Sequence, residues 1–557
     1  MTTPSFRLII PRFPAFNEYA RTARSTTALG PILTATAATQ TPGWAVEVID
    51  ENNLRRLPHR LRDKNSINHR KLQEVEPASV VGFCVDWSVS APRAFELADI
   101  YNRLGALTIA GGHHVRQLPE EALRNGIDVV ILGEGESIIA EILKAYAELR
   151  QEILDCGMSG SDYDLTALLT DRLSAIAGIA FIDSAGQMVV NSPIARQQNC
   201  QQRLQPNFGL LHYAKVDVYP LQWRRGCPFN CGFCTAEKKS SAAKPQELLD
   251  AVKHYAENFG ATDFFVVDDY FGGRDAETKE ALRLLIDYHE LTGRKLSFNI
   301  QTQLSACLDE ELLELLRRAK VKRVRFVYRP PIKQELESQY SYNWLNNAVY
   351  YTKLWRRAGF KVHGLFMFAY PYPTAKISAD AVILDKGDGN YLCPKVPLAD
   401  QERQTKKFIR RLRLDELSIS LAVPVPGTEL RRQLEQAGCL LDLPWHYYDG
   451  GHPLYQSPDY EPEELYQALN RIKKSFRNWR YYARRLLSGF LDLPHWLARN
   501  LRQTFQETAE NLEDWFWHFN ANSHFSRALE AAKEEALMQR KLQLDQELAR
   551  QAANPNG

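Results

Sequence analysis

Short apolar segments alternate with longer amphipathic segments over the first 150 residues. Apolar or alternating runs predict strands at residues 7–11, 44–50, 80–85, 107–110 and 129–132. Patterns with helical spacing predict helices at residues 26–39, 94–104, 120–125 and 137–149. Short buried strands that alternate with helices are typical of a parallel sheet with helices on both faces. We therefore predict a doubly wound α/β domain over residues 1–150.

The same alternation resumes between residue 220 and about residue 430. It predicts strands at residues 264–267, 296–300, 323–327, 362–368 and 417–421, with helices such as 276–291 and 310–318 between them. This order and size predict a partial or full β/α barrel over residues 220–430. Residues 151–219 are predicted to connect the two domains and to form a hairpin at 178–191. After the barrel we expect a helical accessory region at residues 431–525. A charged helical tail with a disordered end is expected at residues 526–557.

Three of the nine cysteines lie on one short stretch with the spacing C-x3-C-x2-C, at Cys227, Cys231 and Cys234. Three thiolates so close together suit an iron–sulfur cluster or a zinc ion, each of which needs four ligands. The next cysteine, Cys307, lies in a leucine-rich helical pattern. The simplest interpretation is therefore a three-cysteine site with one open coordination position. An apolar, strand-like segment precedes the cysteine stretch, and a segment with a helical pattern follows it. This order is expected for a ligand site at the carboxyl end of a strand.

This cysteine stretch, with Phe233 directly before the last cysteine, resembles the signature of the radical S-adenosylmethionine (SAM) enzymes. The resemblance implies that the three cysteines hold a catalytic [4Fe–4S] cluster. It also implies that SAM chelates the unique iron and is cleaved to a 5′-deoxyadenosyl radical. Asp268 and Asp269 resemble the acidic stretch that lies near the SAM methionine group in this family. Gln301 and Gln303 alternate along the third barrel strand, so we expect them to line the barrel interior as cofactor-binding residues.

Two glycine-rich loops follow predicted strands of the first domain, at residues 111–114 and 133–136. With the sequence around residues 80–88, they resemble the Rossmann-like (flavodoxin-like) cobalamin-binding domain that precedes the radical SAM domain in many enzymes. The resemblance extends over most of residues 5–150. It implies cobalamin contacts from these loops, at Trp87, Ser88, Gly111, Gly112, His113, Gly133 and Glu136.

The chain departs from these relatives in two places. The loop after the first strand has no histidine, whereas cobalamin-dependent mutases carry an Asp-x-His-x-x-Gly motif there. Its absence suggests cobalt without a histidine lower ligand and leaves open a degenerate domain that binds no cobalamin. Where relatives often have Gly-Ile-Glu-Ser, which contacts the SAM ribose, this chain has residues 327–331, Val-Tyr-Arg-Pro-Pro. An insertion at residues 372–397 is predicted to form a lid or a substrate contact.

Composition excludes some classes of partner and compartment. Lysines and arginines number 69 and aspartates and glutamates 67, so a formal net charge of +2 gives no electrostatic case for nucleic acid. No run of about 18 apolar residues and no secretory leader pattern is found, and nine cysteines in so long a chain do not form a disulfide framework. We therefore predict a cytoplasmic protein. Aromatics interleaved with arginines at residues 475–520 leave membrane association open but favour helix packing.

These patterns resemble the cobalamin-type radical SAM enzymes, such as the hopanoid methylases and magnesium-protoporphyrin cyclases. The resemblance implies hydrogen abstraction from an unactivated carbon of a small-molecule or lipid substrate, followed by methylation with cobalamin as the methyl carrier. It also implies an electron donor such as flavodoxin or ferredoxin. Ring-forming, rearranging or oxidative chemistry with the same cofactors is the alternative. A non-catalytic cluster-binding sensor is a second alternative, favoured only by the missing ribose motif.

Overall fold

The computed structural model describes most of the chain up to residue 476 and, beyond it, only residues 525, 528, 529 and 532. The gaps are residues 1–2, 15–16, 64–65, 156–164, 193–203, 230, 239–240, 243, 329–338, 371–375, 378–380, 386–389, 395 and 458–459. The predicted tail at 526–557 and the aromatic segment at 475–520 therefore lie almost entirely outside the described residues. The chain divides into two compact units. Unit 1 comprises Met1–Phe326, Tyr351–His363 and Val425–Thr428, and unit 2 comprises Val327–Tyr350, Gly364–Pro424 and Glu429–Gly557.

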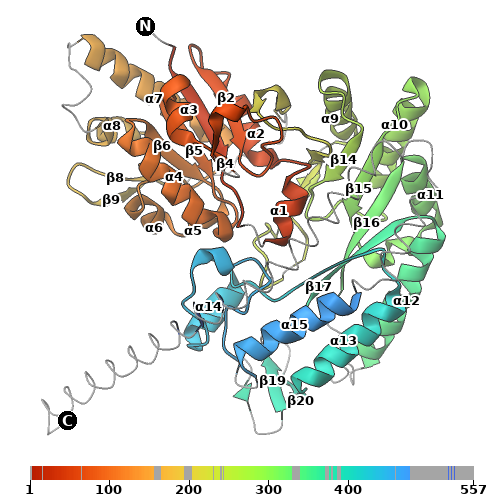
Figure 1. Ribbon diagram of the computed structural model, residues 1–557. Helices are drawn as coiled ribbons and strands as arrows, with labels where there is room; N and C mark the ends of the chain where they lie inside the picture. The colour runs from red at the N-terminus through yellow and green to blue at the C-terminus, as the bar shows by residue number, and fades with distance from the viewer. Residues whose placement is uncertain are drawn as a thin grey trace, which may run out of the picture. The chain divides into compact units, whose positions relative to one another are not determined.

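Unit 1 contains an eight-stranded sheet in the order β10-β2-β1-β5-β6-β7-β8-β9 (Figure 1). Its main parallel strands are β1 (Ser5–Ile10), β2 (Ala45–Asp50), β5 (Val80–Cys84), β6 (Leu107–Gly111) and β7 (Val129–Ile131). Numbered along the chain, these five strands lie in the order 2-1-3-4-5. That order defines the flavodoxin-like doubly wound fold, as predicted. The short β10 (Leu211–His212) joins β2 in parallel.

Helices pack against this sheet and connect its strands (Figure 1). Helix α2 (Leu29–Ala38) packs on α7 (Gly135–Asp155), and α3 (His69–Val75) packs on α4 (Ala91–Arg103). The shorter helices are α1 (Glu18–Ala23), α5 (His113–Gln117), α6 (Pro119–Arg124) and α8 (Leu165–Ser174). The predicted α2, α4 and α6 are confirmed to within a few residues, and the predicted α7 is confirmed but extends six residues further, to Asp155. The sequence analysis missed α8, and it missed α1, α3 and α5 because five to seven residues are too short to show a helical period.

The predicted hairpin at residues 178–191 is confirmed as β8 (Ile179–Ile182) and β9 (Met188–Val190). Its turn is closed by the carboxylate of Asp183, which accepts from the backbone N–H groups of Ala185 and Gln187 at 2.9 and 2.8 Å. Strand β8 pairs antiparallel with β7. The connecting segment therefore extends the parallel sheet by two antiparallel strands, which the sequence did not reveal.

A second set of strands in unit 1 forms the first part of the predicted barrel. The neighbours β11 (Tyr219–Leu221), β14 (Asp263–Val266), β15 (Ser297–Gln301) and β16 (Val321–Tyr328) are parallel. Helices α9 (Pro245–Asn258), α10 (Ala276–Thr292) and α11 (Glu310–Arg318) follow β11, β14 and β15 in the chain and pack side by side. Asp275 caps α10 by accepting from the Thr278 N–H, and Gly293 ends it in the left-handed conformation. This repeated β/α order agrees with the predicted fold class.

Unit 2 carries the later elements of the chain. They are most of α12 (Gln339–Arg357) and β17 (Lys361–Met367), then α13 (Leu398–Leu412), β21 (Glu416–Ser420), α14 (Glu429–Gln436) and α15 (Pro462–Phe476). Helices α13 and α15 lie side by side (Figure 1), and Arg471 donates to the Glu402 carboxylate at 2.8 Å. The insertion at residues 372–397 contains three antiparallel strands, β18 (Lys376–Ile377), β19 (Ala381–Asp385) and β20 (Asn390–Pro394). Within the described part of the chain, no helix combines the length and apolar character needed to cross a membrane.

Candidate functional site

The order of the first sheet reverses direction at β1, because β2 and β5 lie on opposite sides of it. In an open parallel sheet, ligands bind outside the carboxyl ends of the strands at such a switch point. The loops after β1, β5, β6 and β7 leave the sheet at this edge. The residues predicted to contact cobalamin lie on the last three of these loops or, for Gly111 and Glu136, at the end of the strand or the start of the helix beside them.

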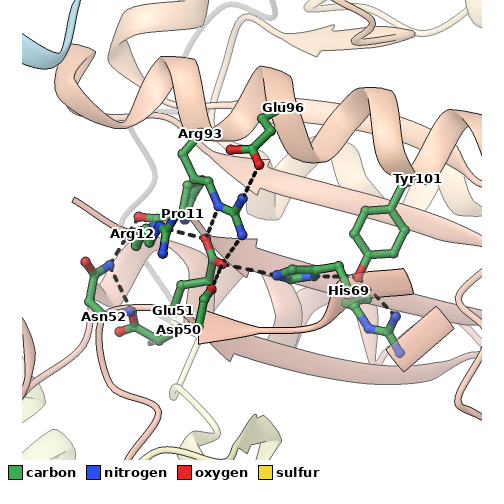
Figure 2. Close-up of polar contacts among 11 residues, drawn as sticks. Pro11, Arg12, Asp50, Glu51, Asn52, His69, Arg93, Glu96 and Tyr101 are labelled. Carbon is green, nitrogen blue, oxygen red and sulfur yellow. Dashed lines mark hydrogen bonds and ion pairs between the residues drawn. The ribbon is translucent and has the colours of Figure 1, made fainter. Parts of the chain in front are cut away.

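The loop after β1 is held by two residues that directly follow β2, Glu51 and Asn52 (Figure 2). The Arg12 N–H donates to Glu51 Oε2 at 3.1 Å, and the Phe13 N–H donates to Asn52 Oδ1 at 2.8 Å. Asn52 Nδ2 donates back to the Pro11 carbonyl at 3.2 Å. The loop that would carry a lower-ligand histidine in mutases is therefore fixed here by hydrogen bonds between its backbone and the side chains of Glu51 and Asn52, which follow β2.

Glu51 is the centre of a buried polar network (Figure 2). Its carboxylate accepts from Arg93 NH2 at 2.7 Å, and His69 Nε2 lies 3.2 Å from Oε1. Burial alone would raise the pKa of Glu51, but the hydrogen bonds from His69 and Arg93 and the charge of Arg93 outweigh it and hold this pKa below its usual range. Burial lowers the pKa of His69, so its neutral ring donates to Glu51 and accepts from the Tyr101 hydroxyl, 2.8 Å from Nδ1. The sequence analysis missed this network.

The loops after β5 and β6 contact each other closely. Gly112 has φ of +116°, and a Cβ atom there would lie 2.6 Å from the carbonyl carbon of Val85, so only glycine fits this crossing. The next residue, His113, donates its backbone N–H to Asp86 Oδ1 at 3.0 Å. Ser88 is buried, and its Oγ lies 3.0 Å from Nδ1 of His114. The predicted residues Gly111 at the end of β6, Gly112, His113 and Ser88 are thus brought to one edge.

Two of the residues predicted to contact cobalamin, Trp87 and His113, contact other side-chain or backbone groups of the protein. Trp87 is 50% exposed and lies against Tyr19, with ring centroids 5.0 Å apart. This leaves an accessible aromatic pair beside the loop after β5, of which only Trp87 was predicted. His113 Nε2 lies 2.8 Å from the Pro426 carbonyl. Burial lowers the pKa of His113, which favours the neutral ring that donates this bond. The assignment of Trp87 and His113 to cobalamin stays a prediction.

The loop after β7 carries the remaining predicted cobalamin residues. Gly133 follows the strand, and Glu136 lies in the first turn of α7, where a carboxylate is favourable. Glu134 and Glu136 both accept from Arg225, at 2.8 Å to NH1 and 3.1 Å to NH2. Glu134 and Arg225 were not predicted as site residues. Their only sequence signal is an acid pair on a glycine turn and an arginine two residues before Cys227.

The cysteine loop begins directly after β11, as predicted. Its ends are joined by a two-stranded antiparallel ladder, in which β12 (Arg224–Arg225) pairs with β13 (Ser241–Ala242). Within the loop, the Cys227 N–H donates to the Glu237 carbonyl at 2.7 Å, and the Cys234 N–H donates to the Cys231 carbonyl at 3.1 Å. These bonds close a compact loop that presents all three cysteines.

The thiols of this loop fit a cluster better than a structural zinc ion. All three are free, with Cys231 exposed and Cys227 and Cys234 half-buried. Burial raises the pKa of Cys227, and the nearby Asp269, Cys234 and Cys231 raise it further. In the part of the chain that the structure describes, no three His, Cys, Asp or Glu side chains are grouped closely enough to hold a metal ion. Three free thiols on one loop match the ligand number of an iron–sulfur cube with one open iron, whereas a structural zinc site uses four protein ligands. That these three cysteines hold a cluster stays a prediction.

The two acids after β14, Asp268 and Asp269, differ in burial. Asp268 is 3% exposed, and its carboxylate accepts from the backbone N–H groups of Trp223 and Arg224 at 2.8 and 2.9 Å. It therefore ties the end of β14 to the root of the cysteine loop. Asp269 reaches the surface, and partial burial raises its pKa. Asp269 is thus the better placed of the two to accept from a SAM ammonium group, a role that stays a prediction.

The remaining predicted SAM residues lie near this pair. Gln301 Nε2 donates to the Asp269 carbonyl at 3.3 Å, so Gln301 reaches the same end of the sheet. Gln303 lies just before the short helix Leu304–Leu308, and Phe233 is half-buried in the cysteine loop. Their contacts to a cofactor stay predictions. In the segment that replaces the ribose motif, Val327 is 58% exposed and Tyr328 is buried, and residues 329–331 lie outside the described residues.

Comparisons with known proteins agree with this geometry. A model of the B12 binding domain matches residues 62–143. The chain is 22% identical over 392 residues to the bacteriochlorophyllide d C-8(2)-methyltransferase of Chlorobaculum tepidum, which covers 67% of this chain and 72% of that protein. It is 24% identical over 273 residues to the anaerobic magnesium-protoporphyrin IX monomethyl ester cyclase of Cereibacter sphaeroides, covering 45% of this chain and 39% of the cyclase.

A solved structure shares the fold. The radical SAM methyltransferase TsrM of Kitasatospora setae, determined with cobalamin and a [4Fe–4S] cluster bound, superposes with a TM-score of 0.55 at 17% identity. The match covers 85% of this chain and 89% of TsrM. By sheet order, cysteine loop and these comparisons, the chain is similar to the class of radical SAM enzymes that carry a cobalamin-binding domain. Within that class the chain is similar to the methyltransferases above, and the predicted cofactors (cobalamin, a [4Fe–4S] cluster and SAM) agree with the comparisons.

Proposed function

We propose that this protein is a cobalamin-dependent radical SAM methyltransferase that methylates an unactivated carbon of a small-molecule or lipid substrate. The observation that carries the proposal is the presence, in one compact unit, of a three-thiol loop and a flavodoxin-like sheet with open loops at its switch point. When bound, a reduced [4Fe–4S] cluster would supply the electron that cleaves SAM to the 5′-deoxyadenosyl radical, and cobalamin would supply a transferable methyl group.

We assign the following roles to the protein's own groups. Cys227, Cys231 and Cys234 would hold the cluster and leave one iron open to SAM. The Asp269 carboxylate would accept from the SAM ammonium group, at a position that Gln301 supports through its hydrogen bond to the Asp269 backbone. The loops after β5, β6 and β7 would hold cobalamin, and the loop after β1 offers it no histidine ligand.

The proposal extends to the compartment, the electron donor and the partners of the protein. Six cysteines in the described part of the chain are free thiols, and an oxygen-sensitive cluster requires reducing surroundings. We therefore place the protein in the cytoplasm, with a flavodoxin or ferredoxin as electron donor. The near-neutral net charge argues against nucleic acid as a partner.

Ring closure by the same cofactors is the second candidate, because an anaerobic cyclase is among the relatives. That match covers 39% of the cyclase, whereas the match to the Chlorobaculum methyltransferase covers 72% of that enzyme. The wider coverage favours methyl transfer.

The proposal is tested with the anaerobically reconstituted protein, SAM, hydroxocobalamin and dithionite. We expect both 5′-deoxyadenosine, from radical cleavage, and S-adenosylhomocysteine, from methyl transfer out of SAM. A variant with all three cysteines replaced by alanine is the control and should lose 5′-deoxyadenosine. 5′-Deoxyadenosine without S-adenosylhomocysteine would refute methyl transfer and favour the cyclase-type reaction. A fully reconstituted protein that forms neither product would refute the enzyme.

A further inference from the structure

Arg225 makes an unusual set of contacts for a residue at the root of the cysteine loop. Its NH1 and NH2 groups donate to Glu134 and Glu136, at 2.8 and 3.1 Å, and its Nε donates to Gln222 Oε1 at 3.2 Å. The Arg225 side chain is 30% exposed, and the two carboxylates are 37% and 25% exposed. Every guanidinium nitrogen is thus engaged, and two acids two residues apart depend on the same cation for neutralisation.

The acidic side of this contact is fixed to the first sheet. Glu134 and Glu136 flank Gly135, the first residue of α7, a 21-residue helix that packs on α2. A Cβ atom at Gly135 would lie 2.7 Å from Thr34 Oγ1 of α2, so the turn is pressed against that helix. Movement of the Glu134–Glu136 turn would therefore require movement of α7 itself.

The basic side is fixed to the barrel strands. Arg224 points away from Arg225, stacks on Trp223 with its guanidinium 4.5 Å from the ring centroid, and donates to Asp275 at 2.7 Å. Asp275 is the N-cap of α10. The backbone N–H groups of Trp223 and Arg224 are held by Asp268 at the end of β14. Arg225 therefore projects from a stiff support, two residues before Cys227.

We propose that Arg225 is a positioning residue, which links the cysteine loop to the Glu134–Glu136 turn and so sets the distance between the cluster and cobalamin. The inference rests on the proposed function for its two cofactors. It also changes the role of Glu136, which the sequence analysis assigned to cobalamin, to that of an anchor for Arg225. Both ends of the link are rigid, so the contact would transmit position between the two loops and not merely cover a surface.

The variants follow from these contacts. Arg225→Met removes the charge and all donors but keeps most of the side-chain length. Arg225→Lys keeps the charge but cannot bind two carboxylates at once. Glu134→Gln with Glu136→Gln removes the partner charges from the other side. Arg172→Met is the matched control, because Arg172 has a similar exposure of 26% and pairs with Glu152 far from the cysteine loop in sequence.

The first readout is spectroscopic. In the reconstituted protein, a reduced cluster near cobalt(II) speeds the spin relaxation of the cobalt signal, measured by microwave power saturation at matched iron and cobalt content. We expect Arg225→Met and the double glutamate variant to lose most of this enhancement, Arg225→Lys to keep part of it, and Arg172→Met to match the parent protein. An undiminished enhancement in Arg225→Met at full cofactor loading would overturn the proposal.

A second readout needs no cofactor. Hydrogen exchange is followed in the metal-free protein, in peptides that cover residues 223–238 and 132–137. Loss of the partly exposed ion pairs should speed exchange roughly fivefold in both peptides together, in Arg225→Met and in the double glutamate variant. Faster exchange in only one peptide, or in neither, would refute the link. A parent protein that takes up no cobalt would refute the proposed function instead, and the exchange result would still decide the role of Arg225.

Discussion

Asp268 and Asp269 are adjacent in sequence but lie in different environments. Asp268 is buried under two backbone donors, whereas Asp269 reaches the surface. Asp268→Ala would leave the N–H groups of Trp223 and Arg224 without their acceptor, and we expect it to lower the free energy of unfolding by roughly 2 to 3 kcal/mol. Asp269→Ala should change it by less than about 0.5 kcal/mol. Denaturant unfolding of the metal-free proteins checks both values.

The same pair separates support from binding in the reconstituted protein. Asp269→Ala is expected to weaken SAM binding, measured by equilibrium dialysis, at an unchanged iron content. Equal losses of stability in the two variants, or full SAM affinity in Asp269→Ala, would contradict the division of roles.

Gly112 is a second residue whose identity the backbone dictates. Gly112→Ala combines a φ of +116° with a clash against the backbone of Val85 and Asp86, and we expect it to cost roughly 3 kcal/mol or more of stability. Gly105→Ala is the control, because its φ of +79° is also positive but no atom lies within 4 Å of the added Cβ. That variant should cost only about 1 kcal/mol. Equal losses would show that backbone strain alone, without the close crossing, fixes this position.

Asp50 carries a pH dependence. Burial raises the pKa of Asp50 from 3.8 to about 6, although Thr27 and Asn52 donate to its carboxylate. The folded chain therefore holds this proton more tightly than the unfolded chain. The resulting stability is complete below pH 3.8 and is lost as the pH rises to 6. Relative to the parent protein, Asp50→Asn should gain roughly 2 to 2.5 kcal/mol in free energy of unfolding between pH 4 and pH 7. Parallel pH curves for the two proteins would contradict this.

Among elements, the contacts that join β2, α3 and α4 centre on one carboxylate. Glu51 and Glu96 both pair with Arg93, but the Glu51 side chain is fully buried and Glu96 is 58% exposed. Glu51→Gln should lower the free energy of unfolding by roughly 3 kcal/mol, because it leaves the largely buried Arg93 with only the exposed Glu96 as a counter-charge. Glu96→Gln should cost less than about 1 kcal/mol. Chemical denaturation near pH 7.5 checks the contrast, and similar losses in the two variants would contradict it.

The helices and strands were predicted well where the spacing of hydrophobic residues shows a clear helical or strand period. Predicted strands such as residues 80–85 and helices such as 276–291 agree with β5 and α10 to within a residue or two. Their spatial order was not predicted, because the choice of which strand pairs on which side of β1 depends on contacts far apart in sequence. The antiparallel pairing of β8 with β7 is hidden for the same reason.

The candidate site was predictable where chemistry follows from spacing. Short local sequence patterns identify the three cysteines, the acids after β14 and the glycine loops. The link between Arg225 and Glu134 joins positions 91 residues apart, and no local pattern marks it. The split between Asp268 and Asp269 was also invisible, since it depends on which carboxylate meets the backbone of another strand.

At the scale of the whole molecule, we propose that one chain loads both a cluster and cobalamin. The three cysteines and the switch-point loops belong to the same compact unit, but they are different ligand sets on different strands. Loss of one cofactor should therefore not prevent uptake of the other.

Anaerobic reconstitution with iron, sulfide and hydroxocobalamin, followed by iron and cobalt analysis of the desalted protein, tests this claim most directly. We expect about four iron atoms and one cobalt atom per chain, and we expect a variant with alanine at Cys227, Cys231 and Cys234 to retain cobalt without iron. A parent protein that retains the cluster but no cobalt would contradict it.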